Sequence, residues 1–481
     1  MNPALYLFAL PLLMAVLGLY PRGGRWLPGT SAVLMLLQAA VAAWLCHPQL
    51  TGATPAAGDF TLDGLGAAFV LITTLVAAAA VLQAAFLLPA EDTGEEAVSQ
   101  RRLCFFYTLA GLFLCAMYAV LLAQNLGYLW IAMEATTLMS APLVHYHRSR
   151  RSLEATWKYL LLCSVGIAFA LFGTVLIFAA QHSIPGEATL SVTGLLARAT
   201  QLDPRLLRLG FIFCLLGYGT KAGLFPLHNW LPDAHSEAPA PASAMLSGAL
   251  LNCALVALWR LSQLVTAAGQ PDLVRQILIP AGAITVLAAS LMLVRQVDLK
   301  RMWAYSSVEH VGLLALAIGL SAGPLFILHA FNHSIVKVAL FLLAGNLLQH
   351  YHTKRLSKLT GLLGGAPVWG LLLAAGSFAI AGSPPFGTFL SEWLILRDTF
   401  AAGEILAAVV VLIGLTITFI AISTHIGRVL FGAPPPKPAP AAQRSWGFTP
   451  AILIGLSLAA GLMLTPAAMS LLALLGRGVL Q

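Results

Sequence analysis

Apolar runs long enough to cross a lipid bilayer follow one another along nearly the whole chain. A hydrocarbon core of about 30 Å needs roughly 20 apolar residues in an α-helix, and runs of about 18–25 such residues recur from beginning to end. Hydrophobic residues make up 59% of the 481 positions, and charged residues only 9%. Because the alternating ten-residue segments of a membrane barrel are missing, the sequence predicts an all-α multi-pass membrane protein with about fourteen transmembrane helices.

The loops between the predicted spans differ in their charge. Loops after odd-numbered spans hold most of the basic residues, such as those at Arg101, Arg102, Arg150 and Arg151. The positive-inside rule makes these loops cytoplasmic, and an even number of spans then puts both termini outside. This topology accounts for most of the net charge of +8. We expect a bacterial or archaeal cytoplasmic membrane and no nucleic-acid partner, because the chain has no basic helix or stacking platform.

Residues 1–481 are predicted to form a single membrane domain. The longest polar stretches cover 88–102, 186–208 and the proline-rich connector 431–447. The sequence has no Walker or dinucleotide-binding glycine motif, and its six cysteines are scattered without a C-x-x-C pair. We therefore expect no cofactor and no metal in this chain, so that side chains inside the bilayer carry any chemistry.

Two of the predicted spans are interrupted by proline and glycine. The stretch "KAGLFPLHNWLP" begins at Lys221, and "SFAIAGSPPFGTFLSEWLIL" breaks just before Glu392. Paired interrupted helices in two halves of a chain indicate an inverted-repeat transporter with its site near the midplane. The separation of Glu134 from Lys221 is similar to that of Glu309 from Glu392, which supports two related halves.

Ionisable side chains inside the predicted spans are the candidate site. A charge at the centre of a spanning helix costs about 2.5–3.5 kcal/mol on insertion scales, so each one needs a structural or functional reason. We predict a proton-transfer relay made of Glu134, Lys221, His329, His333, Lys337 and Glu392. Supporting candidates nearer the helix ends are His228, Asp233, Lys300 and Glu309.

His329, His333 and Lys337 are spaced at i, i+4 and i+8. This spacing puts the three side chains on one face of a helix, along about 12 Å of its axis. The alternatives are a hydrogen-bonded histidine pair that only packs, or a two-histidine metal site. "HAFNH" lacks the glutamate of the zinc-protease motif, and no third ligand is visible in the sequence.

Glu134 and Lys221 also allow a second interpretation, a buried salt bridge that only fixes helix packing. Buried ion pairs stabilise less than apolar packing does, which favours a functional reason for keeping them. A carboxylate that moves toward or away from the lysine would switch it between holding and releasing a proton. For Lys300, as for Lys158 and Arg301, the alternative is a cytoplasmic loop cation that serves topology.

Three stretches, "GYGTKAGLFPLHNWLPDAHSE", "DLKRMWAYSSVEHVG" and "YLWIAMEATTLMS", resemble the antiporter-like subunits of complex I and of membrane-bound group 4 nickel–iron hydrogenases, relatives of Mrp antiporters. "HNWLPDAHSEAPAPASAMLSGALLNCALVALWR" is most similar to the hydrogenase-4 component F type. The resemblance implies fourteen helices with two inverted five-helix repeats, at about 103–265 and 273–431. It also implies broken helices seven and twelve and a proton path along the central plane of the membrane.

The resemblance gives each candidate a place in the family pattern. Glu134 matches the glutamate of helix five, Lys221 the lysine of broken helix seven, and Glu392 the ionisable residue of broken helix twelve. The helix-eleven set consists of His329, His333 and Lys337. Where many relatives carry a central lysine in helix eight, this chain has Asn252, which cannot titrate. The relay is therefore either interrupted there or continued by water and the helix-eleven histidines.

These observations lead to a main functional hypothesis and two alternatives. The main hypothesis is a proton-translocating membrane subunit of a redox complex, whose electron-transfer chemistry is carried by iron–sulfur, nickel–iron or quinone-linked partner subunits. Whether such a chain counts as part of an enzyme depends on those partners. The first alternative is a secondary cation/proton antiporter, or a subunit of an ion-coupled uptake complex, that has no redox partners. The second is a structural scaffold that does not transport ions.

Overall fold

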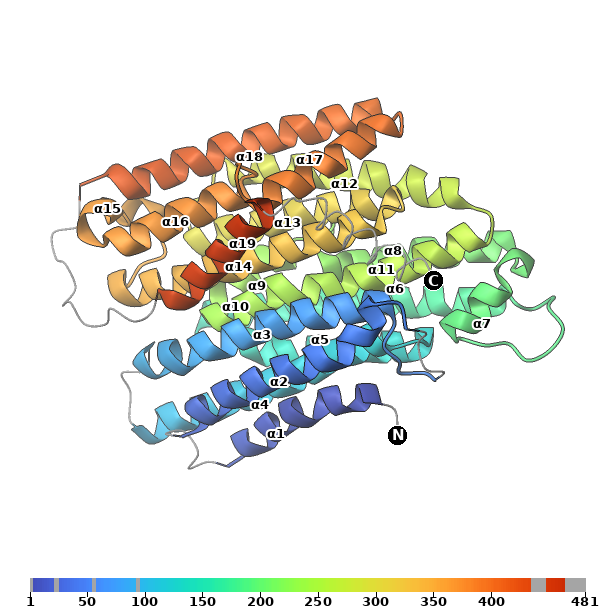
Figure 1. The fold of residues 1–481 in the computed structure, drawn as a ribbon, viewed down its shortest axis with the longest axis horizontal. Coiled ribbons are helices and arrows are strands. Elements are labelled where there is room, and N and C mark those ends of the chain that lie inside the picture. The colour runs from blue at the N-terminus through green and yellow to red at the C-terminus, as the bar shows by residue number, and fades with distance from the viewer. Residues whose placement is uncertain (1–2, 21–25, 54–57, 92–95, 434–446, 463–481) are drawn as a thin grey trace.

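The computed structural model describes residues 3–20, 26–53, 58–91, 96–433 and 447–462. Its helices run side by side along the long axis of the molecule (Figure 1), and the described residues form isolated β-bridges but no strand. The first helices are a 3₁₀ turn at Pro3–Phe8, α1 (Ala9–Gly18), α2 (Leu27–Leu50), α3 (Gly64–Glu91), α4 (Glu96–Leu122), α5 (Leu126–Val144) and α6 (Arg150–Ala179).

The middle of the chain alternates long helices with short ones. It contains α7 (Val192–Ala197), a 3₁₀ turn at Ala199–Gln201, α8 (Pro204–Ala222), α9 (Trp230–Glu237), α10 (Ala240–Met245), a π-helical turn at Leu246–Leu250 and α11 (Leu251–Ala267). The remaining helices are α12 (Pro271–Leu293), α13 (Leu299–Gly319), α14 (Gly323–Tyr351), a 3₁₀ turn at Leu356–Lys358, α15 (Leu362–Gly365), α16 (Pro367–Ile380), α17 (Gly387–Ala401), α18 (Ile405–Phe431) and α19 (Phe448–Leu462).

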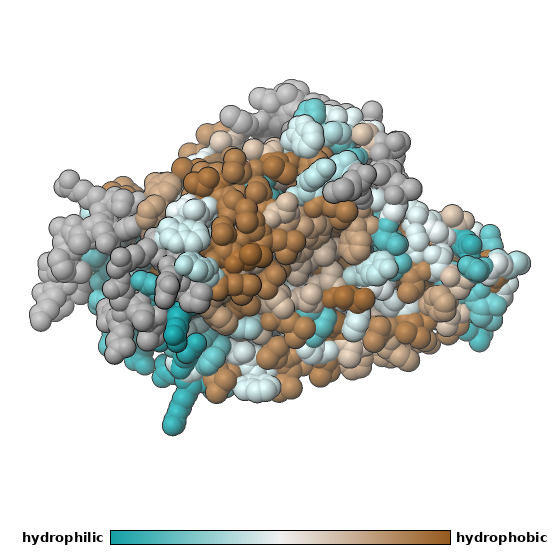
Figure 2. Space-filling model, turned by 90° about the horizontal axis from the view of Figure 1, so that it is seen from below, coloured by the Kyte–Doolittle hydropathy of each residue, from teal (hydrophilic) through white to brown (hydrophobic). Residues whose placement is uncertain are grey.

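The outer surface of the bundle is apolar. Large hydrophobic side chains such as Trp44 (70% exposed) and Leu406 (79% exposed) point outward, and Figure 2 shows apolar residues between two more polar ends. Among the described residues, eight helices are long and apolar enough to cross a membrane, and three apolar helices are shorter. The predicted all-helical multi-pass membrane protein is confirmed. Most of the predicted connector at 431–447 lies outside the described residues.

Both predicted helix interruptions are present. Helix α8 ends at Ala222, Gly223 adopts a left-handed conformation (φ +88°), and helix resumes only at Trp230. In the later half, α16 ends at Ile380 and α17 begins at Gly387. Glycine adopts a positive φ at little cost, so it readily ends a helix. The sequence therefore stops each helix beside an ionisable side chain.

Glycines bring two pairs of helices into direct backbone contact. A Cβ added to Gly217 of α8 would lie 2.5 Å from the carbonyl oxygen of Gly166 in α6. A Cβ on Gly282 of α12 would lie 2.6 Å from the carbonyl oxygen of Gly312 in α13. Small residues allow such close packing inside membranes, where apolar burial drives helix association little. The pairs fix α8 against α6 and α13 against α12.

Arg260 ties α11 to the ends of two other helices. It is buried (5% exposed). Its Nη2 lies 3.1 Å from Asp63 Oδ2 and donates to the Leu121 carbonyl at 2.8 Å, while Nη1 donates to the Ala123 carbonyl. This guanidinium satisfies carbonyls at the end of α4 that the helix leaves free.

We expect Arg260→Met to lower the free energy of unfolding by about 2–3 kcal/mol, because Asp63 and two carbonyl groups lose their donor. Thermal unfolding of the detergent-purified protein measures this loss. Arg397→Gln is the control, because its side chain is 55% exposed, so its loss should stay within about 0.5 kcal/mol. Equal losses for the two variants would contradict the anchoring role.

Candidate functional site

Lys221 lies at the end of the first half of a broken helix. It is the second-last residue of α8, and its side chain is fully buried. Its Nζ donates to Thr137 Oγ1 at 2.7 Å and to Tyr159 OH at 2.8 Å, and it stands 4.8 Å from the centroid of the Tyr159 ring. Thr137 belongs to α5 and Tyr159 to α6, so three helices meet at this ammonium. Its direct partners are neutral oxygens and an aromatic face.

Glu134 does not form the salt bridge that the packing interpretation requires. Its Oε1 accepts a hydrogen bond from Ser164 Oγ at 2.9 Å, and its Oε2 has no hydrogen-bond partner among the described residues. Glu134 and Thr137 lie one turn apart on the same face of α5. In this structure the Glu134 carboxylate therefore interacts with the Lys221 ammonium only electrostatically, across a gap, and not by direct contact.

A histidine cluster occupies the second half of the bundle. His329 and His333 share a face of α14 as predicted, and His310 of α13 packs against both, with ring centroids 5.1 and 5.0 Å away. His310 Nδ1 and His329 Nε2 are 3.1 Å apart, and His329 Nδ1 lies 2.9 Å from Ser391 Oγ in α17. Imidazoles joined in this way can accept a proton on one nitrogen and release one from the other.

Glu392 adjoins the cluster at the second helix interruption. Its Oε1 is 3.9 Å from His310 Nδ1, and the carboxylate is 7% exposed. Gly382, with φ of +65°, leaves the space that the carboxylate fills, because a Cβ there would overlap Glu392 Oε2. The absence of a side chain at position 382 therefore positions the predicted glutamate toward the imidazoles.

Lys337 and Glu309 lie in the helices that carry the histidines. Lys337 is fully buried, and its Nζ donates to the Trp303 carbonyl at 2.7 Å. Glu309 is 1% exposed, and neither carboxylate oxygen has a hydrogen-bond partner among the described residues. A buried carboxyl group without donors is costly to keep ionised, which suits a group that binds a proton reversibly.

Asn252 lies beyond the π-helical turn, between the two halves. It is 1% exposed, and its Nδ2 donates to the Gly248 carbonyl at 3.0 Å and to Ser334 Oγ at 2.8 Å. Ser334 is the neighbour of His333 in α14. The position of the expected lysine is therefore polar and connected to the histidine helix, but it holds no titratable group.

Two supporting candidates lie at the first helix interruption. His228 is buried, with its Nε2 3.3 Å from Met292 Sδ. Asp233 in α9 bridges two basic residues, 3.1 Å from Lys158 Nζ and 3.3 Å from Arg301 Nη1. These contacts give Asp233 a clear structural role in joining α9 to α6 and α13.

Lys300 differs from the loop cation that the topology argument suggested. It lies in the first turn of α13, is 2% exposed, and its Nζ donates to the Ala238 carbonyl. The positive-inside rule assigns a basic residue to one side of the membrane. It does not tell whether the ends of neighbouring helices bury that residue. Lys300 therefore belongs to the packed interior of that end of the bundle.

Three residues that build the site carry little or no signal in the sequence. His310 directly follows Glu309 in an apolar run, and that adjacency was the available signal. Thr137 and Tyr159 gave none, because hydroxyl residues are common in membrane helices and only the fold brings them to Lys221.

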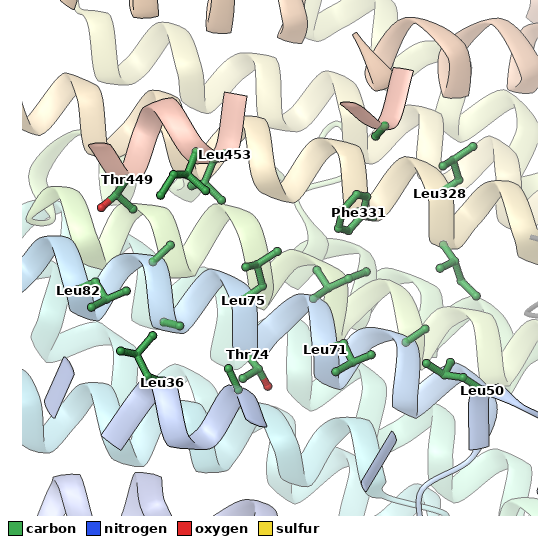
Figure 3. Close-up of a pocket in the computed structure, with 18 of the residues that line it drawn as sticks. Leu36, Leu50, Leu71, Thr74, Leu75, Leu82, Leu328, Phe331, Thr449 and Leu453 are labelled. Atoms are coloured by element: carbon green, nitrogen blue, oxygen red, sulfur yellow. The ribbon is translucent and has the colours of Figure 1, made fainter. Parts of the chain in front are cut away.

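The described residues include no candidate metal site, and one cavity between their helices is apolar. Among the described residues, no group of three or more His, Cys, Asp or Glu side chains is arranged to hold a metal ion. A cavity of about 690 Å³ between α2, α3, α14 and α19 is lined almost wholly by aliphatic residues (Figure 3). Thr74 and Thr449 are its polar lining residues, so it offers no titratable group.

Residues 123–418 match the family described as "NADH:quinone oxidoreductase/Mrp antiporter, TM". The chain belongs to this family. A hydrogenase-4 component F homolog of Methylacidiphilum infernorum (isolate V4) is 39% identical over 386 residues, covering 79% of this chain and 80% of that protein. The resemblance inferred from the sequence motifs is confirmed.

Solved structures share the fold. A chain of the membrane-bound sulfane sulfur reductase, an archaeal respiratory membrane complex, aligns with a TM-score of 0.86 at 24% identity, covering 99% of this chain and 98% of that one. A chain of the Mrp complex from Dietzia sp. DQ12-45-1b aligns with a TM-score of 0.82 at 21% identity, covering 100% and 97%. All six of the main candidate residues lie inside the family match.

We expect Gly382→Ala to destabilise the protein more than Gly403→Ala does. Both glycines have positive φ, which costs about 1–3 kcal/mol for other residues. A Cβ at 403 meets open space, whereas one at 382 overlaps the Glu392 carboxylate. Thermal unfolding measures the stability lost by each variant, and the difference between the two losses reports the cost of the overlap. Adding Glu392→Ala to Gly382→Ala should restore part of the lost stability. Equal destabilisation of the single variants would contradict this geometry.

Proposed function

We propose that this chain is a proton-translocating membrane subunit of a multi-subunit redox complex of the membrane-bound hydrogenase or complex I type. The observation that carries the proposal is the set of ionisable side chains buried in an apolar bundle: Lys221, Glu309, His310, His329, His333, Lys337 and Glu392. Burial of so many costly groups indicates ion transport. The similarity to a hydrogenase-4 component F homolog supports redox partners, to which we assign all electron-transfer cofactors.

We further propose that the chain crosses a bacterial or archaeal cytoplasmic membrane about fourteen times, with both termini outside. Treating α8 with α9, α10 with α11, and α16 with α17 as single spans supports this number. The two inverted repeats would cover about 103–265 and 273–431, within one membrane domain. The similar placement of helix interruptions in the two halves supports this division.

In the proposed mechanism, Lys221 holds a proton that the hydroxyl groups of Thr137 and Tyr159 can pass on. A change in the distance of the Glu134 carboxylate would alter how firmly the ammonium keeps that proton. From Lys221 the path continues past Asn252 by water, then through His333 and His310 to His329 and Glu392. Each transfer is an exchange between neighbouring donors and acceptors.

We expect Lys221→Met to abolish coupled proton transport in vesicles reconstituted with the complete complex, while assembly survives. Methionine fills a similar volume but binds no proton. Transport is measured with a pH-sensitive dye inside the vesicles, and assembly by size-exclusion chromatography. Unchanged transport would overturn the proposed role of Lys221.

Lys221→Arg serves as the informative control. Arginine keeps the positive charge and can donate to the same hydroxyl groups, but it does not release its proton in proteins. We therefore expect an assembled complex that also fails to transport. Full transport with arginine would show that charge alone suffices at this position and that the residue is structural.

Asn252 permits a separate prediction for the middle of the path. Asn252→Leu should slow transport by up to roughly tenfold, because it removes two neutral hydrogen bonds that contribute about 0.5–1.5 kcal/mol each. Asn252→Ser, which can still bind water, should retain most of the rate in the same vesicle assay. Normal transport in Asn252→Leu would exclude a path beside this residue.

The scaffold alternative has its own test. Normal transport after both Glu134 and Lys221 are neutralised would favour it.

A secondary cation/proton antiporter is the second candidate function, including an ion-coupled uptake subunit. The structural likeness to a chain of the Mrp complex supports it. Neighbouring genes for a nickel–iron large subunit and iron–sulfur proteins would favour the redox complex, whereas genes for other antiporter subunits would favour this alternative. Sodium-driven proton movement without an electron donor would also favour antiport.

A further inference from the structure

A second cavity, of about 670 Å³, lies where the ends of several helices meet. Its walls come from the α5–α6 corner, the α9–α10 junction, the start of α13, and the end of α14 with the loop that follows. The sequence assigns these segments to the same, basic side of the membrane. Its charged and histidine lining residues are His147, Arg151, Glu237, Asp298, Lys300, Arg301, His352, Lys354, Arg355 and Lys358.

The cavity lining has more positively charged side chains than negatively charged ones. Six Lys and Arg residues line the cavity with two acidic residues, Glu237 and Asp298, and one of the six, Arg301, is paired with Asp233. Lys354 already binds both, with its Nζ 2.8 Å from Glu237 Oε1 and 3.5 Å from Asp298 Oδ2. The exposed side chains of Arg151, Arg355 and Lys358 form no ion pair within the part of the chain that the structure describes. The cavity therefore has uncompensated positive charge.

His147 of the lining lies within reach of several of these charges. Desolvation is the main cause that lowers the pKa of His147 to about 4; the charges of Lys300, Arg102 and Lys354 lower it further, and the charge of Glu237 opposes them. His147 lies in the corner between α5 and α6, outside the spanning helices. Cations are disfavoured in such a cavity and anions are favoured.

The position of the cavity indicates the kind of anion. Helices α6 and α14 have 30 and 29 residues, more than the roughly 20 that cross the hydrocarbon core, so their ends reach the headgroup layer. Basic pockets between membrane helices at this depth fit anionic lipid headgroups. Leu348, Val297 and Pro239 add apolar surface beside the charges, as the glycerol region of a lipid requires.

We propose that this cavity is a binding site for a phosphate group, supplied by the headgroup of an anionic phospholipid. Arg151, Arg355 and Lys358 would contact the phosphate, since guanidinium groups match phosphate oxygens in geometry and lysine adds a point charge. The site lies at the junction of α6, α9, α13 and α14, so a bound headgroup would link both halves of the bundle. The proposal is independent of the proton-transfer function.

The test compares lipid binding by the full-length protein and two double variants. Arg355→Gln with Lys358→Gln removes two cavity charges, and Arg150→Gln with Arg428→Gln removes two exposed charges that do not line the cavity. Native mass spectrometry in a neutral detergent measures the Kd for added phosphatidylglycerol, with phosphatidylcholine as the neutral lipid. At about 1 kcal/mol per basic residue, the cavity variant should bind phosphatidylglycerol roughly thirty-fold more weakly.

The control variant should bind phosphatidylglycerol as the wild type does, and phosphatidylcholine should bind weakly to all three proteins. Binding to the wild type should also weaken as sodium chloride is raised, a measurement that needs no variant. Equal phosphatidylglycerol affinity in the cavity and control variants, or no salt dependence, would overturn the proposal.

Inorganic phosphate distinguishes the two sources of the same chemistry. Competition by millimolar phosphate for the phosphatidylglycerol site supports a phosphate site, and phosphate binding without any preference for the lipid identifies free phosphate as the ligand. An acidic segment of another subunit that crosslinks to Arg355 in the complex, with no lipid retained, would overturn the proposal.

Discussion

The ammonium of Lys221, held by two hydroxyl groups inside an apolar bundle, is the interaction on which the rest of the first half depends. Neutral partners solvate the charge without cancelling it, so the position of every surrounding dipole affects the proton. The glycine contacts that fix α8 against α6 keep Tyr159 in reach, and Trp230 donates to the Thr220 carbonyl at 2.8 Å, which ties the resumed helix to the end of α8. The helix interruption and its packing are thus parts of one arrangement.

The two halves solve the same problem with different chemistry. The first surrounds a single cation with hydroxyl groups, whereas the second groups imidazoles with carboxylates beside its own helix interruption. A histidine cluster holds a proton with less dependence on any one partner, because several nitrogens share it. Between the halves, Asn252 and Ser334 form a neutral link that can order water but cannot store charge.

The sequence predicted the features that depend on one helix at a time. Proline and glycine located both interruptions, and the spacing of His329 and His333 placed them on one face. Periodicity does not tell which faces of different helices meet, so the contribution of His310 from α13 and of Tyr159 from α6 required the fold. Counting loop charges likewise hid the burial of Lys300. The opposite charges of Glu134 and Lys221 allowed a salt bridge as one interpretation, but the helices do not make that contact.

Asp233 gives α9 a mechanical property. Its carboxylate is shared between Lys158 of α6 and Arg301 of α13, so a shift of α9 toward either helix stretches the ion pair on the other side. Both ion pairs are partly exposed, so dissolved ions screen them, and the tether between α9 and its two neighbouring helices weakens as the ionic strength rises.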